Sequence, residues 1–583
     1  MAFAQKTSAR GGAAALVACC IVATATAAAA TARIDLTATA AATTKFPHFW
    51  EASVGSSHAA MGLRVDWREH LTMAVRDCGF KGIRMHAIFD DDMSVVFPPC
   101  NFPPCADHGG HGIPAPAVYS WYNVDKLYDF LLSINVQPLV ELSFMPQALA
   151  GCRQGCPTAH SIAVNMTACI YGQHYMEIRM PPGHAALGTH NGHGGGTPKF
   201  NGPVVLDFGI WHDLIAAFAH HLIERYGEAE VLQWPFEVWN EMWGVTYPDP
   251  YMGLFNASAV ALRGVNPKLR VGGPATMQTQ HLQDFVNRAT ALGVRPDFVS
   301  AHLYPSDANC SGSSSAGFPH ASEIDCFASV VKDAAVMVAP LPFYLTEYNV
   351  GLSTSSGLDL NRAAAFITRN AFLLAGTLDV FSYWCFSDIF EEMGLIPTPF
   401  HSGYGLITVN GIPKPAYRAF ELLHRAGDMR VPVNVTKTTA AGGSLVVAAT
   451  VNASSGGEEP AAASFSWRSL QIFASFYSKE AGQVDSPLSQ GASNLEVRIE
   501  IAHDASISLP ATAIGHRIDA NHTAPINAWV KEGSPDYPTA AQQEAMMNAS
   551  QLATESIVVA KVAPGLSAIV FTMQPDSVFH LQF

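Results

Sequence analysis

The sequence predicts an α/β fold in which a (β/α)8 TIM barrel is followed by an antiparallel β-sandwich domain. Strand patterns and amphipathic helix patterns alternate eight times between residues 49 and 426, which is the repeat that closes such a barrel. After residue 428 the alternation ends, and short strand patterns are separated by clusters of Gly, Ser, Pro and Asn. A chain of 583 residues also exceeds what one hydrophobic core supports. We therefore expect a barrel over residues 33–427 and a sandwich over residues 428–583.

The eight expected barrel strands are apolar runs of the kind that a parallel sheet buries on both faces. They lie at residues 49–55, 82–89, 137–144, 235–242, 269–275, 297–304, 342–349 and 380–387. The helix patterns that follow them lie at residues 63–77, 124–134, 211–226, 252–265, 281–292, 322–338, 360–376 and 416–426. A doubly wound open sheet is the weaker alternative, because eight strand–helix units are the number that a barrel requires.

In the second domain the strand patterns are shorter and alternate between apolar and polar residues. They lie at residues 444–451, 470–476, 495–501, 556–562 and 568–572. The stretch at 517–539 is polar and aromatic but carries no pair of acids and no nucleophile, so we assign it a packing role.

Two long inserts interrupt the barrel, at residues 93–120 and 150–203. Both leave from the carboxyl ends of expected strands, so we expect them to overhang the mouth of the barrel. The second insert is rich in Cys and His. A zinc site there is disfavoured, because the spacing matches no common pattern and oxidised cysteines do not bind metal.

Residues 1–32 have the pattern of a cleaved signal peptide, since Lys6 and Arg10 precede an apolar run rich in small residues. A membrane anchor is the alternative, which the weak hydrophobicity of Ala and Thr disfavours. We therefore expect a secreted or lumenal protein (extracellular, lysosomal or vacuolar) with no membrane contact after cleavage. The net charge of −15 argues against a nucleic-acid partner, because phosphate recognition requires a basic face.

Glycosylation sequons and cysteine pairs fit the same secretory route. The cysteine pairs 100/105, 152/156 and 310/326 are candidate disulfides in an oxidising compartment. Cys78 and Cys385 lie within apolar elements, where we expect them to pack as small hydrophobic side chains. The seven Asn-x-Ser/Thr sequons begin at Asn165, Asn256, Asn309, Asn434, Asn452, Asn521 and Asn548.

Two glutamates are the candidate catalytic residues. Glu241 ends the run VLQWPFEVWNE in the fourth strand, and Glu347 lies near the end of PFYLTEYN in the seventh. Barrel closure would bring both carboxylates to one cleft. Glycoside hydrolysis uses such a pair, because one carboxyl group protonates the leaving oxygen while the other attacks or stabilises the sugar. The alternative for either residue is a buried ion pair, for example with Arg84.

The two carboxyl groups need different surroundings, since one must stay protonated and the other ionised. We expect His302 and Tyr348 to donate hydrogen bonds to Glu347, Asn240 to bind a sugar hydroxyl, and Trp384 to stack on a sugar ring. The separation of the carboxyl groups decides the stereochemistry: about 5–5.5 Å gives retention and about 6.5–9.5 Å gives inversion. The sequence leaves both open. The reaction needs no cofactor and no metal, and we expect neither.

Several long motifs carry a resemblance to a known family. They include GFKGIRMH at 79–86, FEVWNE at 236–241, LTEYN at 345–349 and YWCFSDIFEEM at 383–393. With these motifs in this order, the chain resembles glycoside hydrolase family 39, especially its β-xylosidase branch, over nearly all of residues 50–425. One departure is Met242, where the family usually has proline after the acid/base glutamate.

The resemblance implies roles for particular residues of this chain. Glu241 would be the general acid/base and Glu347 the nucleophile of a retaining mechanism, and the sandwich would belong with the barrel. The residues implied to line the sugar site are His86, Asn240, His302, Tyr304, Tyr348, Trp384, Glu391 and Glu392.

The expected function is a retaining exo-glycoside hydrolase, a β-D-xylosidase that releases xylose from xylo-oligosaccharides or β-xylosides. An α-L-iduronidase-type enzyme of the same family is one alternative, but its anionic substrate requires a cationic clamp, and Lys and Arg are sparse at the strand ends. A catalytically silent carbohydrate-binding protein is the other alternative, which the presence of both glutamates disfavours. In each case the partner is a glycoside or oligosaccharide, and the sequence leaves the oligomeric state open.

Overall fold

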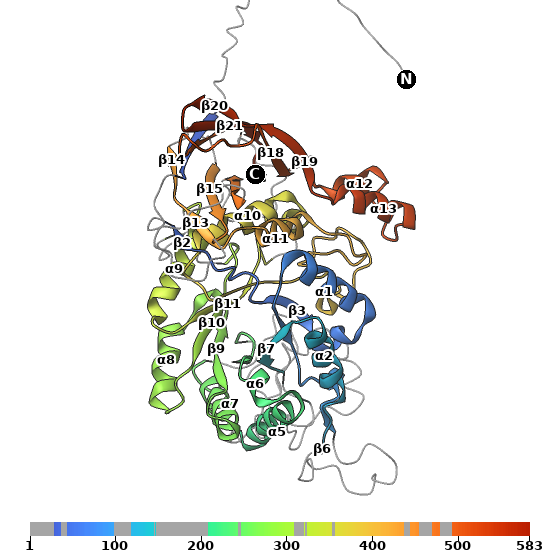
Figure 1. Cartoon of the computed structure of the whole chain (residues 1–583). Coiled ribbons are helices and arrows are strands. Elements are labelled where there is room, and N and C mark those ends of the chain that lie inside the picture. Colours follow the sequence, from blue (N-terminus) through green and yellow to red (C-terminus); the bar gives the residue numbers. More distant parts are fainter. Residues whose placement is uncertain are drawn as a thin grey trace, which may run out of the picture.

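The computed structural model describes residues 28–36, 43–97, 118–144, 146, 208–242, 247–307, 310, 320, 323–352, 356–436, 443–453, 469–478 and 493–583. Within these ranges the chain forms a barrel and a two-sheet sandwich that pack against each other (Figure 1). The sandwich lies at the top of Figure 1, where the blue N-terminal strand joins the orange and red C-terminal strands.

Eight parallel strands close the barrel, and their order around it follows their order in the chain. Each strand pairs in parallel with its two neighbours, which confirms the (β/α)8 fold and excludes the open sheet. The strands are β3 (Val54–His58), β4 (Gly82–His86), β7 (Gln137–Leu142), β8 (Pro235–Val238), β9 (Arg270–Thr276), β10 (Phe298–His302), β11 (Phe343–Tyr348) and β12 (Val380–Tyr383).

Several strands are shorter than their sequence patterns, because the apolar run continues into the adjoining loop. The first strand differs most: β3 begins at Val54, whereas the pattern begins at residue 49. Phe49 and Trp50 are buried before the strand starts, and the Phe49 ring lies 5.6 Å from that of Phe381. The apolar pattern begins at residue 49 because Phe49 and Trp50 are buried, although neither belongs to the strand.

Helices follow the strands around the barrel, and their limits agree with the sequence patterns to within four residues. They are α1 (Val65–Cys78), α2 (Tyr122–Ser133), α5 (Gly209–Tyr226), α7 (Tyr251–Val265), α8 (Leu282–Ala291), α9 (Cys326–Val338), α10 (Asn361–Leu373) and α11 (Pro415–His424).

The first insert leaves the barrel through a short antiparallel pair, β5 (Val96–Phe97) and β6 (Val118–Tyr119). Residues 98–117 of this insert and the whole of 150–203 lie outside the described residues. Their expected place above the mouth stays a prediction.

Two sheets form the sandwich, in the orders β14-β1-β17-β21-β20 and β19-β18-β22-β16-β15-β13-β2. The strands are β1 (Ala28–Asp35), β2 (Thr44–Lys45), β13 (Met429–Val431), β14 (Val433–Thr436), β15 (Gly443–Val451), β16 (Gln471–Ser478), β17 (Leu495–Ala502), β18 (Thr512–Ile518), β19 (Ala553–Val558), β20 (Ala560–Ala563), β21 (Leu566–Met573) and β22 (Ser577–Gln582).

The N-terminal strands correct the expected domain limits. β1 pairs in parallel with β17, and β2 pairs with β13, so both strands belong to the sandwich and the barrel begins later than residue 33. The sandwich is therefore not purely antiparallel. The expected signal-peptide limit at residue 32 falls inside β1, where Ala30, Ala32 and Ile34 alternate into the core. This alternation was not recognised in the sequence, because the residues on both sides of residue 28 are mostly alanine. Cleavage of a signal peptide stays a prediction.

Two further features of the sandwich differ from expectation. The pattern at 556–562 is divided between β19 and β20, which lie in different sheets. Between β18 and β19 the chain forms two helices, α12 (Pro525–Lys531) and α13 (Ala540–Ala549), where the sequence indicated only a packing segment.

The two domains share a continuous apolar core through α10, which lies against the seven-stranded sheet. The Phe372 ring stacks obliquely on Phe473 at 5.1 Å, and the Ser475 hydroxyl donates a hydrogen bond of 2.8 Å to the Ala365 carbonyl. The sandwich is thus packed on the barrel, as the resemblance implied.

One predicted disulfide is present, between Cys310 and Cys326. Cys78 and Cys385 are free and buried, as expected. The pairs 100/105 and 152/156 lie outside the described residues. Within the described ranges, no helix is both long enough and apolar enough to cross a bilayer.

A buried lysine joins three segments close to the carboxyl end of β12. The Lys414 ammonium, which has no solvent exposure, lies 2.7 Å from Asp359 Oδ1, 2.7 Å from Asp388 Oδ2 and 3.0 Å from the Gly403 carbonyl oxygen. These contacts tie α11 to the loops that follow β11 and β12.

Replacing this lysine should destabilise the protein strongly. In Lys414→Met, two buried carboxylates lose their counterion, which costs about 3–5 kcal/mol in comparable sites. Thermal unfolding should show a clear fall in Tm. Lys268→Met, at an exposed position, is the control and should change stability by less than about 0.5 kcal/mol. An equal Tm for both variants would contradict this account of Lys414.

Candidate active site

Arg84 of β4 occupies the centre of the barrel interior and has no solvent exposure. Its guanidinium donates hydrogen bonds to Glu237 Oε2 (2.5 Å), Glu347 Oε1 (2.8 Å) and Asn240 Oδ1 (2.8 Å). It also forms an ion pair with Glu141 Oε2 at 2.8 Å. A guanidinium presents five N–H donors in a rigid plane, so this one group fixes the side chains of three different strands.

Glu347, at the end of β11, is held through both carboxylate oxygens. Oε1 accepts the bond from Arg84, and Oε2 accepts a bond of 2.8 Å from the Tyr304 hydroxyl. His302 Nδ1 lies 3.5 Å from Oε2, and His86 Nε2 lies 3.6 Å from Oε1. From the sequence, an ion pair with Arg84 was the alternative to a catalytic role. Glu347 does form this ion pair, and it also faces Glu241, so the ion pair does not exclude the catalytic role.

Glu241 lies three residues beyond the end of β8, with its backbone in the left-handed region (φ 52°). Few non-glycine residues adopt this conformation. The Glu241 N–H donates to the Ala275 carbonyl at 2.9 Å, which fixes the turn, and His302 Nδ1 lies 2.9 Å from Glu241 Oε1. This turn directs the side chain toward Glu347.

The two glutamates face each other with His302 between them. One oxygen of each carboxylate and one nitrogen of His302 all lie within 4.8 Å of one another. Oxygens this close favour the smaller carboxyl separation of retaining enzymes, about 5–5.5 Å, over the 6.5–9.5 Å or so of inverting ones. Barrel closure has brought together two side chains from the fourth and seventh strands, as the sequence predicted.

Burial dominates the electrostatics of the site. It raises the pKa of Glu347 to about 7, helped by the negative charge of Glu241 and opposed by His302, Arg84 and Tyr304. Burial likewise raises the pKa of Glu141 to about 7, and it lowers the pKa of His302. Because Arg84 alone faces several carboxyl groups, the site favours one shared proton, so that one carboxyl group is protonated while another is ionised.

On the side of β4 and β12, an aromatic and acidic wall adjoins the glutamate pair. His86 Nδ1 lies 2.7 Å from Glu141 Oε2, and the His86 ring lies 4.4 Å from that of Trp384. Glu392 Oε1 lies 4.0 Å from His86 Nε2, and the neighbouring Glu391 accepts a bond of 3.0 Å from the His58 backbone N–H. The expected site residues His86, Trp384, Glu391 and Glu392 are thus contiguous.

His58 extends this wall away from the glutamate pair. Its Nδ1 lies 3.4 to 3.7 Å from carboxylate oxygens of Asp92, Asp90 and Glu391. Burial lowers the pKa of His58, but these carboxylates outweigh it and raise the pKa to about 10. His58 is therefore a cation that offsets part of the acidic charge.

Tyr348 is the one expected site residue that the structure places elsewhere. Successive side chains of a strand point to opposite faces, so Glu347 points into the barrel and Tyr348 points outward to the helices. Its ring stacks on Phe381 at 3.6 Å and contacts Phe327 and Phe366 at 6.0 and 6.5 Å. It neither lines the sugar site nor donates to Glu347, whose tyrosine donor is Tyr304.

The sequence interpretation missed the importance of Arg84 and Glu237. Glu237 accepts one bond from Arg84 and another of 2.9 Å from the Thr346 hydroxyl, so it links β8 to β11. Both residues could have been recognised in the sequence, because each is a charged residue flanked by apolar residues inside a strand. The candidate residues were instead chosen at the strand ends, where side chains can meet a substrate.

A closed parallel barrel that presents two facing carboxylates at the carboxyl ends of its strands defines the class of site that glycoside hydrolases use. The profile described as "Glycosyl hydrolases family 39" matches residues 32–168 and 173–563. The chain belongs to this family, and it is therefore an O-glycosyl hydrolase.

Individual relatives agree with this assignment. "Beta-xylosidase" from Caldicellulosiruptor saccharolyticus is 32% identical over 522 residues, which cover 88% of this chain and 90% of that protein. "Alpha-L-iduronidase" from Homo sapiens is 30% identical over 145 residues, which cover 22% of this chain and 21% of that protein. A solved GH39 Beta-xylosidase from Caulobacter crescentus has a TM-score of 0.66 at 24% identity, covering 95% of this chain and 99% of that one, and shares the fold.

Removing the Tyr304 hydroxyl should shift the pH dependence of activity. Its hydrogen bond stabilises the ionised form of Glu347, so Tyr304→Phe raises the Glu347 pKa further, and the ionised fraction is lost at a higher pH. A bond to a charged group is worth about 1.5–3 kcal/mol, so the acidic limb of kcat/KM should move up by about 1–2 pH units.

Tyr348→Phe is the matched control, because this tyrosine faces the helices and its hydroxyl has no hydrogen-bond partner within the described structure. Its acidic limb should coincide with that of the wild type. A limb that shifts in Tyr348→Phe, or stays in place in Tyr304→Phe, would contradict the arrangement described for Glu347.

Proposed function

We propose that this protein is a retaining exo-acting β-D-xylosidase that releases xylose from xylo-oligosaccharides or β-xylosides. The observation that carries the proposal is the close approach of Glu241 and Glu347, whose nearest oxygens lie within 4.8 Å. The "Beta-xylosidase" relative matches along most of both chains, which supports the same sugar.

In the first step, an oxygen of Glu347 attacks the anomeric carbon and forms a glycosyl ester. At the same time Glu241 gives its proton to the departing glycosidic oxygen. In the second step Glu241, now ionised, takes a proton from water, and the water oxygen displaces Glu347. Two inversions leave the configuration unchanged, and both glutamates return to their starting states. Arg84 and Tyr304 keep Glu347 oriented throughout, because each binds a different oxygen.

The charges around the site favour a neutral sugar over a uronic acid. Arg84 contacts the nucleophile but is already engaged by three carboxylates and an amide. The wall beyond His86 carries Glu391 and Glu392, which would repel the carboxylate of an iduronide. This arrangement supports the xylosidase over the iduronidase alternative.

A panel of aryl glycosides tests the choice of sugar. We expect 4-nitrophenyl β-D-xyloside to be hydrolysed with kcat/KM at least about tenfold above that of a β-D-glucoside, since the extra hydroxymethyl group must fit a site shaped for a smaller ring. Hydrolysis of an α-L-iduronide without hydrolysis of the xyloside would overturn the proposal in favour of the alternative.

Azide rescue tests the two catalytic roles separately. Glu241→Ala should lose about 10²–10⁴-fold in activity, with the larger losses for poor leaving groups, and Glu347→Ala should lose more. Azide should restore some activity to both variants. The product should be the α-xylosyl azide with Glu347→Ala, because azide attacks once from the vacated side, and the β-xylosyl azide with Glu241→Ala. The opposite pattern would exchange the two assignments, and a catalytically silent binding protein would show neither loss nor rescue.

We also propose that the protein is a secreted or lumenal glycoprotein. The disulfide between Cys310 and Cys326 is of the kind that forms in an oxidising compartment. Four sequon asparagines lie at exposed positions of the described structure, where a glycan fits without repacking: Asn434, Asn452, Asn521 and Asn548. Protein purified from its natural source should lose mass on treatment with an N-glycosidase, and an unchanged mass would refute the glycoprotein assignment.

A further inference from the structure

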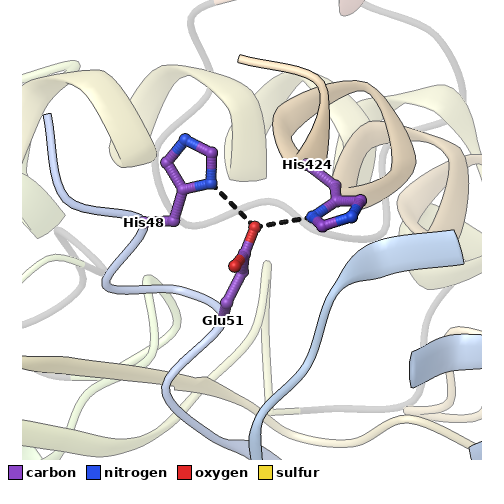
Figure 2. Close-up of side chains that lie close together, drawn as sticks. All are labelled: His48, Glu51 and His424. Carbon is purple, nitrogen blue, oxygen red and sulfur yellow. Dashed lines mark hydrogen bonds and ion pairs between the residues drawn. The ribbon is translucent and has the colours of Figure 1, made fainter. Parts of the chain in front are cut away.

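Two histidines and a glutamate converge on one point (Figure 2). They lie close to the amino end of β3, whereas Glu241 and Glu347 lie at the carboxyl ends of their strands. His48 and Glu51 lie in the segment that enters the barrel before β3, and His424 is the last residue of α11. His48 Nδ1 and His424 Nδ1 each lie 2.8 Å from the same oxygen, Glu51 Oε1. One atom from each of the three side chains lies within 4.8 Å of the others.

We propose that His48, Glu51 and His424 form a structural site for a divalent transition metal, with Zn²⁺ the best-fitting ion. Two imidazoles and one carboxylate are a donor set that suits Zn²⁺, and water would complete the tetrahedron. Bonds of about 2.0–2.1 Å in a tetrahedron place ligand atoms about 3.3 Å apart. The two His–Glu51 contacts of 2.8 Å are about half an ångström shorter than this, and all three ligand atoms lie within 4.8 Å of one another. Binding an ion therefore requires the three side chains to adjust around it.

The surroundings prepare this geometry. Lys81 binds the other oxygen, Glu51 Oε2, at 2.9 Å, so the carboxylate is oriented with Oε1 directed at both imidazoles. Such a contact to the far side of a ligand is a usual feature of metal sites.

Gly79, which follows α1, provides the space that the His424 ring needs. A Cβ atom on Gly79 would lie 2.1 Å from His424 Nδ1, far inside contact distance. The site also has access to solvent, because the side chain of His424 is 42% exposed and that of Lys81 is 70% exposed. An ion can therefore enter without unfolding of the barrel.

A bound ion would hold the segment that enters the barrel against the helix that ends it. The same junction is linked by the Phe46 N–H, which donates to the Asp428 carbonyl at 2.7 Å, and by the pairing of β2 with β13. Metal binding should therefore stabilise the fold at the seam between the first strand and the last helix. This inference does not depend on the proposed sugar or on turnover.

The test uses the full-length protein, freed of metal with EDTA and titrated with Zn²⁺ alone or Co²⁺ alone. We expect Zn²⁺ to raise the Tm and Co²⁺ to give the visible absorption of a site with fewer than six ligands. In His424→Gln, which loses one ligand at a partly exposed position, Zn²⁺ affinity should fall at least about tenfold. Gly79→Ala keeps all three ligands but displaces the ring, so it should weaken binding as well.

Two controls separate this site from others. His281→Gln removes an exposed histidine of the α8 N-terminus and should bind Zn²⁺ like the wild type. Glu241→Gln tests the cluster of Glu241, His302 and Glu347, which is also within ligand distance of one ion. Retained binding in Glu241→Gln with loss in His424→Gln supports the proposal. Loss in Glu241→Gln with retention in His424→Gln, or no Zn²⁺ binding by the wild type, overturns it.

Discussion

The buried guanidinium of Arg84 is the interaction on which the active site depends. It is fully enclosed and faces Glu141, Glu237 and Glu347, so its single positive charge offsets several carboxyl groups that could not be buried together without it. The same group binds the Asn240 amide oxygen, which sets the residue next to Glu241. One side chain on β4 therefore fixes Glu347, Asn240 beside Glu241, and the two buried glutamates Glu141 and Glu237.

This arrangement explains how a site with so many acids can divide them between two roles. One cation is too few to hold every carboxyl group ionised, so the site retains a proton, as the raised pKa values of Glu347 and Glu141 indicate. Glu347 receives donors on both oxygens, which favours its anion, whereas Glu241 reaches the pair from a strained turn and contacts His302. The two donors to Glu347 therefore oppose the rise in its pKa that burial causes.

The sequence was sufficient to predict the barrel and the meeting of Glu241 and Glu347 in it, because both have local signatures. Buried strand patterns repeat with helices. A carboxylate that ends an apolar strand is costly without a function, so Glu241 and Glu347 were candidates from one strand each. Arg84 and Glu237 were harder to recognise, since their importance lies in contacts between strands far apart in the chain.

The error at Tyr348 and the missed strand β1 have physical reasons too. Tyr348 was expected in the site because it follows Glu347 in the same motif. Neighbouring residues of a strand face opposite sides of the sheet, so with Glu347 inside the barrel Tyr348 faces the helices. β1 begins with three alanines, and only Ala30, Ala32 and Ile34 alternate with polar residues, a pattern too weak to distinguish from the preceding Ala-rich segment. Its pairing partner β17 lies more than 450 residues later.

The central claim is that Glu347, held by Arg84 and Tyr304, forms the covalent bond to the sugar. The most direct measurement is mass spectrometry after incubation with 2,4-dinitrophenyl 2-deoxy-2-fluoro-β-D-xyloside, whose fluorine slows both steps while the good leaving group allows the first. We predict one added fluoroxylosyl group per chain, located on the peptide that contains Glu347. A label on Glu141, Glu237 or Glu241, or hydrolysis of the reagent without any trapped ester, would contradict the account.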